Sequence, residues 1–128
     1  MKTPIKDLNE LLRGMNPETT KGEFVFITSK KPLELESILT FKEKEGITYI
    51  LEKELAIKNS FNIEGIWKMI TLKVNSDLQA IGFLAKITEA LAKEKISVNA
   101  VSAYYHDHLF VPKEKAKKAL KILKNLTK

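Results

Sequence analysis

The chain has 128 residues, of which 44% are apolar and 30% are charged, and it contains no cysteine. This composition is typical of a globular protein, and the lack of cysteine excludes disulfides, thiol catalysis and thiolate zinc sites. The formal net charge is +6, from 22 basic and 16 acidic side chains, but Arg13 is the only arginine. Because base readout and bidentate phosphate contacts favour arginine, the basic balance alone does not indicate nucleic-acid binding.

The apolar runs of the sequence, such as residues 24–27, are far too short to span a bilayer. No apolar stretch follows the lysines near the N-terminus, so no secretory signal is visible. We therefore expect a cytoplasmic protein without a membrane partner, folded as one compact domain or as two small ones.

Periodicity and turn residues predict alternating strands and helices. Asp7 is expected to cap the first helix, which Pro17 closes, and Gly46 is expected to form a hairpin turn. In chain order the expected elements are a helix at 7–15, strands at 24–28, 37–44 and 47–51, a helix at 53–60, a strand at 66–75, a helix at 80–94, strands at 98–105 and 109–111, and a helix at 113–126.

This order of elements predicts an α+β fold with an antiparallel or mixed sheet and helices on one side. Two strand–strand–helix segments about 60 residues apart form a weak internal repeat. The β–α–β–β–α pattern at 66–126 is five-sixths of a ferredoxin-like unit, and its last strand is missing. Such a sheet leaves a face or an edge to cover, so we expect a homodimer.

Two segments carry a resemblance to a known family. Residues 70–85, ITLKVNSDLQAIGFLA, resemble the first strand, loop and helix of an ACT domain. Residues 104–112, YYHDHLFVP, resemble the signature of a family of small, mostly bacterial proteins that carry two ACT-like halves. The resemblance implies two ferredoxin-like units of the ACT type, at 1–64 and 65–128. Little room exists for a helix between residues 28 and 37, so we expect the first half to be degenerate.

ACT domains are small-molecule sensing modules, usually for amino acids, and they are often attached to metabolic enzymes. They commonly bind ligands at interfaces, beside the loop that joins the first strand to the first helix. The resemblance therefore implies a regulatory, non-catalytic module with an amino-acid ligand, a metabolic enzyme as partner and no cofactor.

The loop before the helix at 80–94 is the first candidate site. Ser76 and Gln79 have the spacing of a capping box, and the remaining amides of the first helical turn suit a carboxylate. Gly82 would let a ligand or a partner backbone approach closely, and Asp77 could pair with an amino group. Alternatively, Ser76 only caps the helix and Gly82 only permits tight packing. The expected ligand contacts here are Asn75, Ser76, Asp77, Leu78, Ile81 and Gly82.

The histidines are the second candidate site. In a strand, His106 and His108 share one face and Asp107 points to the opposite face. They could bind an acidic or zwitterionic ligand, hold a metal ion, or only orient a turn. No further histidine exists as a third ligand, so we predict no metal site and add both histidines, with Asn99, to the ligand contacts.

Lysines also form a stripe on the helix at 113–126, which contains a single acid, Glu114. A solvated face is one interpretation, and a weak binding surface for RNA or an acidic protein is the other. Catalysis has little support, since the chain contains neither a G-x-S-x-G nor an H-E-x-x-H pattern. A purely structural dimer and a nucleic-acid binder remain the alternatives to ligand sensing.

Overall fold

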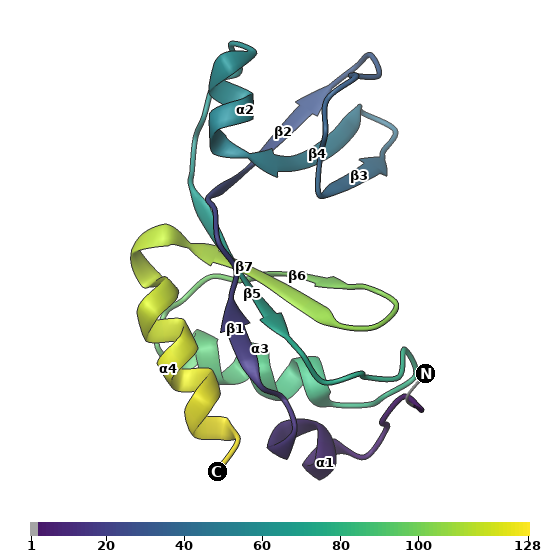
Figure 1. Cartoon of the computed structure of the whole chain (residues 1–128), viewed down its shortest axis with the longest axis vertical. Coiled ribbons are helices and arrows are strands. Elements are labelled where there is room, and N and C mark those ends of the chain that lie inside the picture. Colours follow the sequence, from purple (N-terminus) through teal and green to yellow (C-terminus); the bar gives the residue numbers. More distant parts are fainter. Residues whose placement is uncertain (1–2) are drawn as a thin grey trace. The chain divides into compact units, whose positions relative to one another are not determined.

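The computed structural model describes residues 3–128; Met1 and Lys2, which begin the predicted half at 1–64, lie outside the described residues. Contacts divide the chain into unit 1, residues 3–21 and 68–128, and unit 2, residues 22–67. The elements are α1 (Leu8–Arg13), β1 (Pro17–Thr19), β2 (Phe24–Ser29), β3 (Leu39–Lys42), β4 (Ile47–Glu52), α2 (Lys53–Lys58), β5 (Trp67–Leu72), α3 (Phe83–Lys93), β6 (Asn99–Ser102), β7 (Asp107–Pro112), a 3-10 turn (Lys113–Lys115) and α4 (Ala116–Leu126) (Figure 1). None of the described helices is long and apolar enough to cross a membrane.

The sheet of unit 1 has the strand order β1, β5, β7, β6. Strand β1 pairs antiparallel with β5, with Pro17 opposite Leu72, and β6 pairs antiparallel with β7, with Asn99 opposite Phe110. The second half of the chain has no last strand of its own, as predicted. Strand β1 fills that place, although the sequence indicated only a helix end at Pro17.

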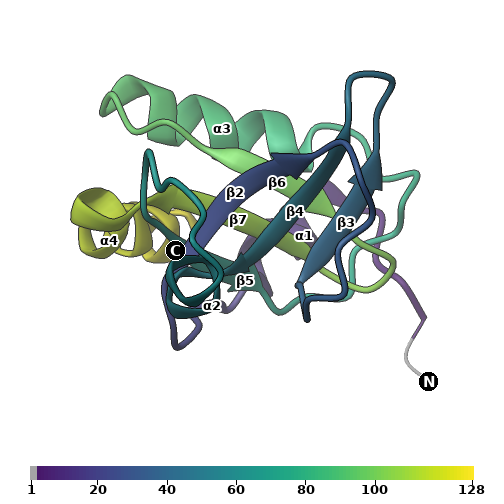
Figure 2. The same ribbon diagram turned by 90° about the horizontal axis from the view of Figure 1, so that it is seen from above.

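The core of unit 1 lies between this sheet and the helices α1, α3 and α4. Alternate residues of β5 and β7 point to the same face of the sheet, and the apolar stripes of the helices pack against them. Figure 2 shows α3 and α4 as neighbours beside β7. The fully buried core residues are Leu11, Met15, Ile70, Leu72, Ile87, Leu91, Leu109, Val111, Ala119 and Leu123. The α+β class with an antiparallel sheet and helices on one side is therefore confirmed.

Unit 2 is a three-stranded antiparallel sheet with the strand order β3, β4, β2, and the short helix α2 follows β4. No helix connects β2 to β3. Instead, Leu33 and Leu35 of the extended connection pack against the core formed by residues such as Val25 and Leu51. The Leu33 N–H donates to the Tyr49 hydroxyl at 2.8 Å, which holds the connection on the sheet. The expected lack of room for a helix in this half is confirmed.

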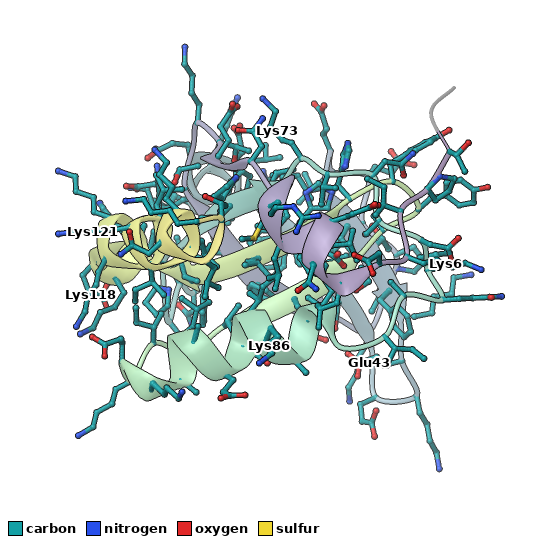
Figure 3. All side chains as sticks on the ribbon, turned by 90° about the horizontal axis from the view of Figure 1, so that it is seen from below. Lys6, Glu43, Lys73, Lys86, Lys118 and Lys121 are labelled. Atoms are coloured by element: carbon teal, nitrogen blue, oxygen red, sulfur yellow. The ribbon has the colours of Figure 1, made fainter. Side chains whose placement is uncertain are left out.

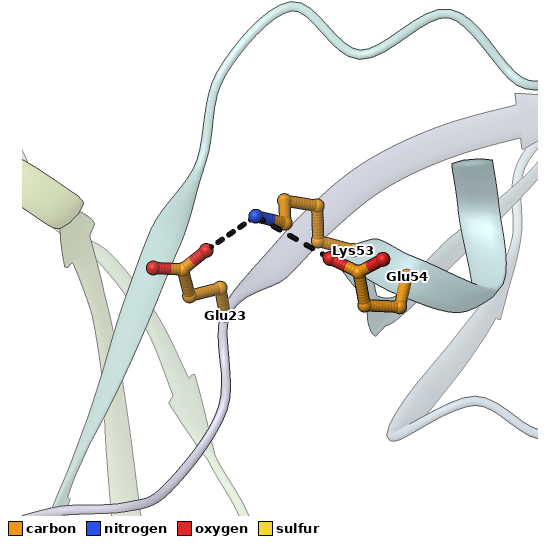
Figure 4. A network of polar contacts seen from close by, with 3 residues as sticks. All are labelled: Glu23, Lys53 and Glu54. Carbon is orange, nitrogen blue, oxygen red and sulfur yellow. Dashed lines mark ion pairs between the residues drawn. The ribbon is translucent and has the colours of Figure 1, made fainter.

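A small ion-pair network joins the start of α2 to β2. The Lys53 ammonium lies 2.7 Å from the Glu23 carboxylate and 3.5 Å from that of Glu54 (Figure 4). The hydrogen bond to Glu23 is the main cause that raises the pKa of Lys53. The backbone N–H of Lys53 also donates to the Glu23 carbonyl at 2.9 Å, so the two contacts set the direction in which α2 leaves the sheet.

Several element boundaries differ from the prediction. The strand expected to reach residue 75 ends at Leu72, and the helix expected at residue 80 begins at Phe83. The strand expected at 98–105 ends at Ser102, and its partner begins at Asp107 instead of Leu109. These shifts lengthen both loops at one end of the unit 1 sheet.

Candidate functional site

The loop between β5 and α3 is held by the N-terminal segment of the chain. Ile5 forms a parallel bridge with Ser76. The Ile5 N–H donates to the Asn75 carbonyl at 2.8 Å, and the Asp77 N–H donates to the Ile5 carbonyl at 2.9 Å. The backbone of residues 75–77 is thus paired, so this part of the loop has a defined position.

The predicted capping box is wrong, because Ser76 and Gln79 both precede the helix. The Ser76 hydroxyl donates to Asp107 Oδ2 at 3.1 Å, and the Gln79 N–H donates to Asp77 Oδ1 at 2.7 Å. The second contact forms an Asx turn, which competes with helix formation. Ser76 is 7% exposed, so its bond to Asp107 is shielded from water.

Gly82 is the N-cap of α3 and not a residue inside the helix. Its φ of +89° lies in the left-handed region, where a glycine is needed. A Cβ at this position would lie 3.7 Å from Leu8 Cδ2, an ordinary contact, so backbone conformation and not crowding requires the glycine. Because Gly82 has no side chain, no side-chain cap satisfies the first-turn amides of α3.

These amides border a pocket of about 160 Å³. Cavities of this volume are small: an engineered apolar cavity of about 150 Å³ holds one benzene molecule. The pocket is lined by Ser76, Asp77, Leu78, Ala80, Gly82, Phe83, Leu84, Ala85, Ser102 and Asp107. A ligand here would contact the loop, the first turn of α3 and the ends of β6 and β7.

Four predicted site residues line this pocket: Ser76, Asp77, Leu78 and Gly82. Two others from the same loop do not. Asn75 contributes its carbonyl to the pairing with Ile5, and the Ile81 side chain is 86% exposed outside the pocket lining.

Asn99, His106 and His108 are not brought to the pocket. Asn99 lies opposite Phe110 and His108 lies opposite Val101, which puts both on the sheet face away from Leu109 and the helices. Asp107 and Ser102, opposite each other, lie on the helix-covered face and line the pocket. Asp107 was missing from the predicted contacts, although alternation with the histidines already indicated that it faces the other way.

The two histidines instead bond to β5 and the loop after it. His106 Nδ1 lies 3.0 Å from the Val74 carbonyl, so this nitrogen donates its hydrogen. His108 Nδ1 lies 2.9 Å from Thr71 Oγ1, and the ring centroids of His106 and His108 are 6.4 Å apart. Burial, followed by the proximity of His106, lowers the pKa of His108.

Among residues 3–128, no three His, Asp or Glu side chains are grouped so that they could hold a metal ion. The histidine pair has two orienting hydrogen bonds, as expected for residues that fix the geometry of a hairpin.

Apolar side chains are exposed in the two loops near the pocket. Leu78 is 63% exposed in the loop before α3, and Tyr104 and Tyr105, in edge-to-face contact at 5.0 Å, are exposed in the β6–β7 hairpin. Large exposed apolar side chains of this kind occur at interaction surfaces.

The lysines of α4 form an exposed cationic surface. Lys118 and Lys121 extend outward from α4 in Figure 3, and Lys118 pairs with Glu94 at 3.3 Å. Ala116, Ala119 and Leu123 on the other side of the helix are buried in the core. The apolar face of α4 is thus already used by the protein, and only the charged face is available.

Comparisons with known proteins give consistent matches. Family models described as ACT domain match residues 3–68 and residues 62–125. No curated protein matches the chain. A protein of unknown function from Vibrio cholerae, described as a possible transport protein, is 44% identical, with 89% of this chain and 91% of that chain covered and a TM-score of 0.83.

Two more distant structures share the fold. A protein from Agobacterium tumefaciens is 13% identical, with 87% of each chain covered and a TM-score of 0.70. The aspartate kinase of Clostridium acetobutylicum, described as an allosteric enzyme, is 16% identical, with 88% of this chain but 34% of that chain covered and a TM-score of 0.61. At these identities the likeness concerns the fold alone.

Proposed function

Because the chain belongs to the ACT domain family, we propose that it is a regulatory, non-catalytic module that binds an amino acid or a similar small metabolite. The pocket at the start of α3 carries this proposal. Its volume of about 160 Å³ is similar to that of a cavity that holds one benzene molecule, and the first turn of α3, which has no side-chain cap, lines it. Among the predicted contacts, those in the pocket are Ser76, Asp77, Leu78 and Gly82, and Asp107 and Ser102 join them.

The chemistry of the lining supports binding. Free amides at a helix N-terminus donate hydrogen bonds to a carboxylate and lie at the positive end of the helix dipole. Ala80, Leu84 and Ala85 provide small or aliphatic walls, and Ser102 and Ser76 provide hydroxyls. Polar groups at fixed positions beside aliphatic walls can set the orientation of a bound ligand.

Thermal unfolding against a panel of the common amino acids and nucleotides tests the proposal. A ligand present at 100 times its Kd stabilises the folded state by about 2.7 kcal/mol. For a chain of this size, that free energy raises Tm by roughly 10 °C. No shift with any member of the panel would contradict ligand sensing.

A pocket-filling variant assigns the shift to this site. Ala85 lines the pocket, and Ala92 is exposed on the same helix seven residues, about two turns, further along. Ala85→Leu should abolish the ligand-induced shift, whereas the matched control Ala92→Leu should retain it. A shift that persists in Ala85→Leu would place the ligand elsewhere.

We further propose that the protein acts as a homodimer that regulates a metabolic enzyme. The exposed Leu78 and Ile81 beside the pocket support a second copy or a partner at this edge. The division into a degenerate first ACT-like half at 1–64 and a second ACT-like half at 65–128 stays a prediction. Sedimentation of the purified protein, alone and with candidate enzymes, measures both assemblies.

A further inference from the structure

The charged side chains that line the pocket are all acidic. Among residues 3–128, the lining contains two carboxylates, Asp77 and Asp107, and no lysine, arginine or histidine. His108 lies on the other face of the sheet and His106 lies outside the lining, so neither imidazole balances these two acids. A simple anion such as a phosphate or a 2-oxo acid would meet two like charges there.

Asp107 is the more buried of the two acids. Its side chain is 6% exposed, and Ser76 donates one hydrogen bond to Oδ2 at 3.1 Å. An ionised carboxylate has about four acceptor positions, so the single bond from Ser76 leaves most of this capacity unused. A buried carboxylate is destabilising unless it is paired, and an ammonium group can pair with it through charge-assisted hydrogen bonds.

The amides of α3 provide the opposite pole of the same pocket. Phe83, Leu84 and Ala85 form the first turn of α3 and all three line the pocket, as Asp107 does. A molecule that carries one cationic and one anionic group would satisfy both poles. The pocket volume of about 160 Å³ can hold a small molecule of this kind.

We propose that Asp107 is the specificity-determining residue of this site, receiving the ammonium of a small zwitterionic amino acid while the first-turn amides of α3 receive its carboxylate. This assignment rests on the proposed ligand-binding function of the pocket. It separates amino acids from their 2-hydroxy and 2-oxo acid analogues, which keep the carboxylate and the side chain but lack the ammonium.

Calorimetric titration with matched pairs tests the assignment. The probes are the amino acids that raise Tm in the panel, each with the 2-hydroxy acid and 2-oxo acid of the same side chain. Wild-type protein should bind the amino acid at least roughly 100-fold more tightly than either analogue, since sites built to bond a ligand NH reject analogues without it by large factors. Equal affinities for the three probes would overturn the assignment.

Asp107→Asn should remove this discrimination. The amino acid should lose most of its affinity, and the ratio to the hydroxy acid should fall at least roughly 10-fold, because the charge-assisted bond is gone. Glu89→Gln is the charge control: Glu89 is exposed, bonds to Lys93 at 3.3 Å and lies outside the pocket lining. It should keep the wild-type ratio. An unchanged ratio in Asp107→Asn would overturn the proposal.

Different results would contradict the proposed ligand site and the proposed role of Asp107. Absence of any binding sensitive to Ala85→Leu contradicts the ligand site itself, whereas binding with an unchanged ratio in Asp107→Asn contradicts only the role of Asp107.

Discussion

Replacement of Gly82 by alanine has opposite effects depending on where the helix begins. Inside a helix, as the sequence pattern suggested, the change would stabilise the protein by about 0.5–1 kcal/mol. At the observed N-cap the φ of +89° is unfavourable for alanine, so the change should destabilise the fold by about 1–2 kcal/mol. Steric crowding does not change the sign of this free-energy difference, since the nearest atom to the new Cβ is Leu8 Cδ2 at 3.7 Å.

Urea denaturation and thermal unfolding measure this difference. Gly82→Ala should lower Tm by roughly 3–10 °C. Gly82→Asn should lower it less, because asparagine tolerates left-handed backbone better than alanine does. Gly65→Ala is the control: Gly65 has no positive φ, and its new Cβ would only contact Trp67 Nε1 at 3.5 Å. A stability gain in Gly82→Ala would refute the described start of α3.

Four further outcomes can be checked. Asp7→Ala, which removes the cap bond to the Glu10 N–H at 3.0 Å, should cost about 1 kcal/mol in urea denaturation; an unchanged midpoint would argue against this cap. Met15→Ala empties a site with 0% exposure, so a loss of about 2–5 kcal/mol is expected, and one below 1 kcal/mol would contradict the packing of residues 3–21 in unit 1. The pKa of His108 is lower in the folded than in the unfolded state, so stability should decline as pH falls below about 6.5 towards the folded pKa, because the unfolded chain takes up the proton first. His108→Gln should flatten that decline, and an identical pH profile would remove His108 as its cause. Ile81→Glu should leave Tm nearly unchanged but weaken self-association in sedimentation, and an unaltered dimer would exclude this edge.

Local patterns were sufficient to predict most elements of the fold. Apolar residues at helical spacing predicted the helix at 80–94, although the residues that the helix buries are Phe83, Ile87 and Leu91 and not Ile81. The β-branched and aromatic run at Phe24 to Thr28 has the strand composition. The short interval between residues 28 and 37 also predicted correctly that no helix forms there, because a helix and its two loops need more chain.

The features that the sequence did not predict, strand β1 and the start of α3, depend on pairing between residues far apart in the chain. Strand β1 is only three residues long and pairs with residues 70–72, so no local pattern indicates it. The S-x-x-Q spacing satisfied a local rule, but Ser76 is bonded to Asp107, 31 residues away, and the loop is paired with Ile5. Competing tertiary contacts therefore displaced the helix start by about one turn.

For the candidate site, the loop residues before α3 were predictable from the sequence, but the lining residues from β6 and β7, Ser102 and Asp107, were not. The position of Ser76, Asp77 and Leu78 before a helix is local information. Asp107 lines the same pocket because β7 lies next to β5 in the sheet, and this order of strands is not local information. Strand alternation alone puts Asp107 on the opposite face from His106 and His108. The same pattern could therefore have predicted Asp107, in place of the two histidines, as the ligand contact.

The pairing of β1 with β5 has a consequence for synthesis of the chain. At about 5–20 residues per second, the ribosome needs roughly 3–11 s to make the 53 residues that separate Thr19 from Leu72. During that interval Leu11 and Met15 have no partners from the later part of the chain and stay exposed to water or chaperones. Residues 22–67, in contrast, have all their own strands as soon as they emerge. A nascent chain that ends before residue 72 and has fully emerged should therefore be protected from proteases in its middle and cut readily near its beginning.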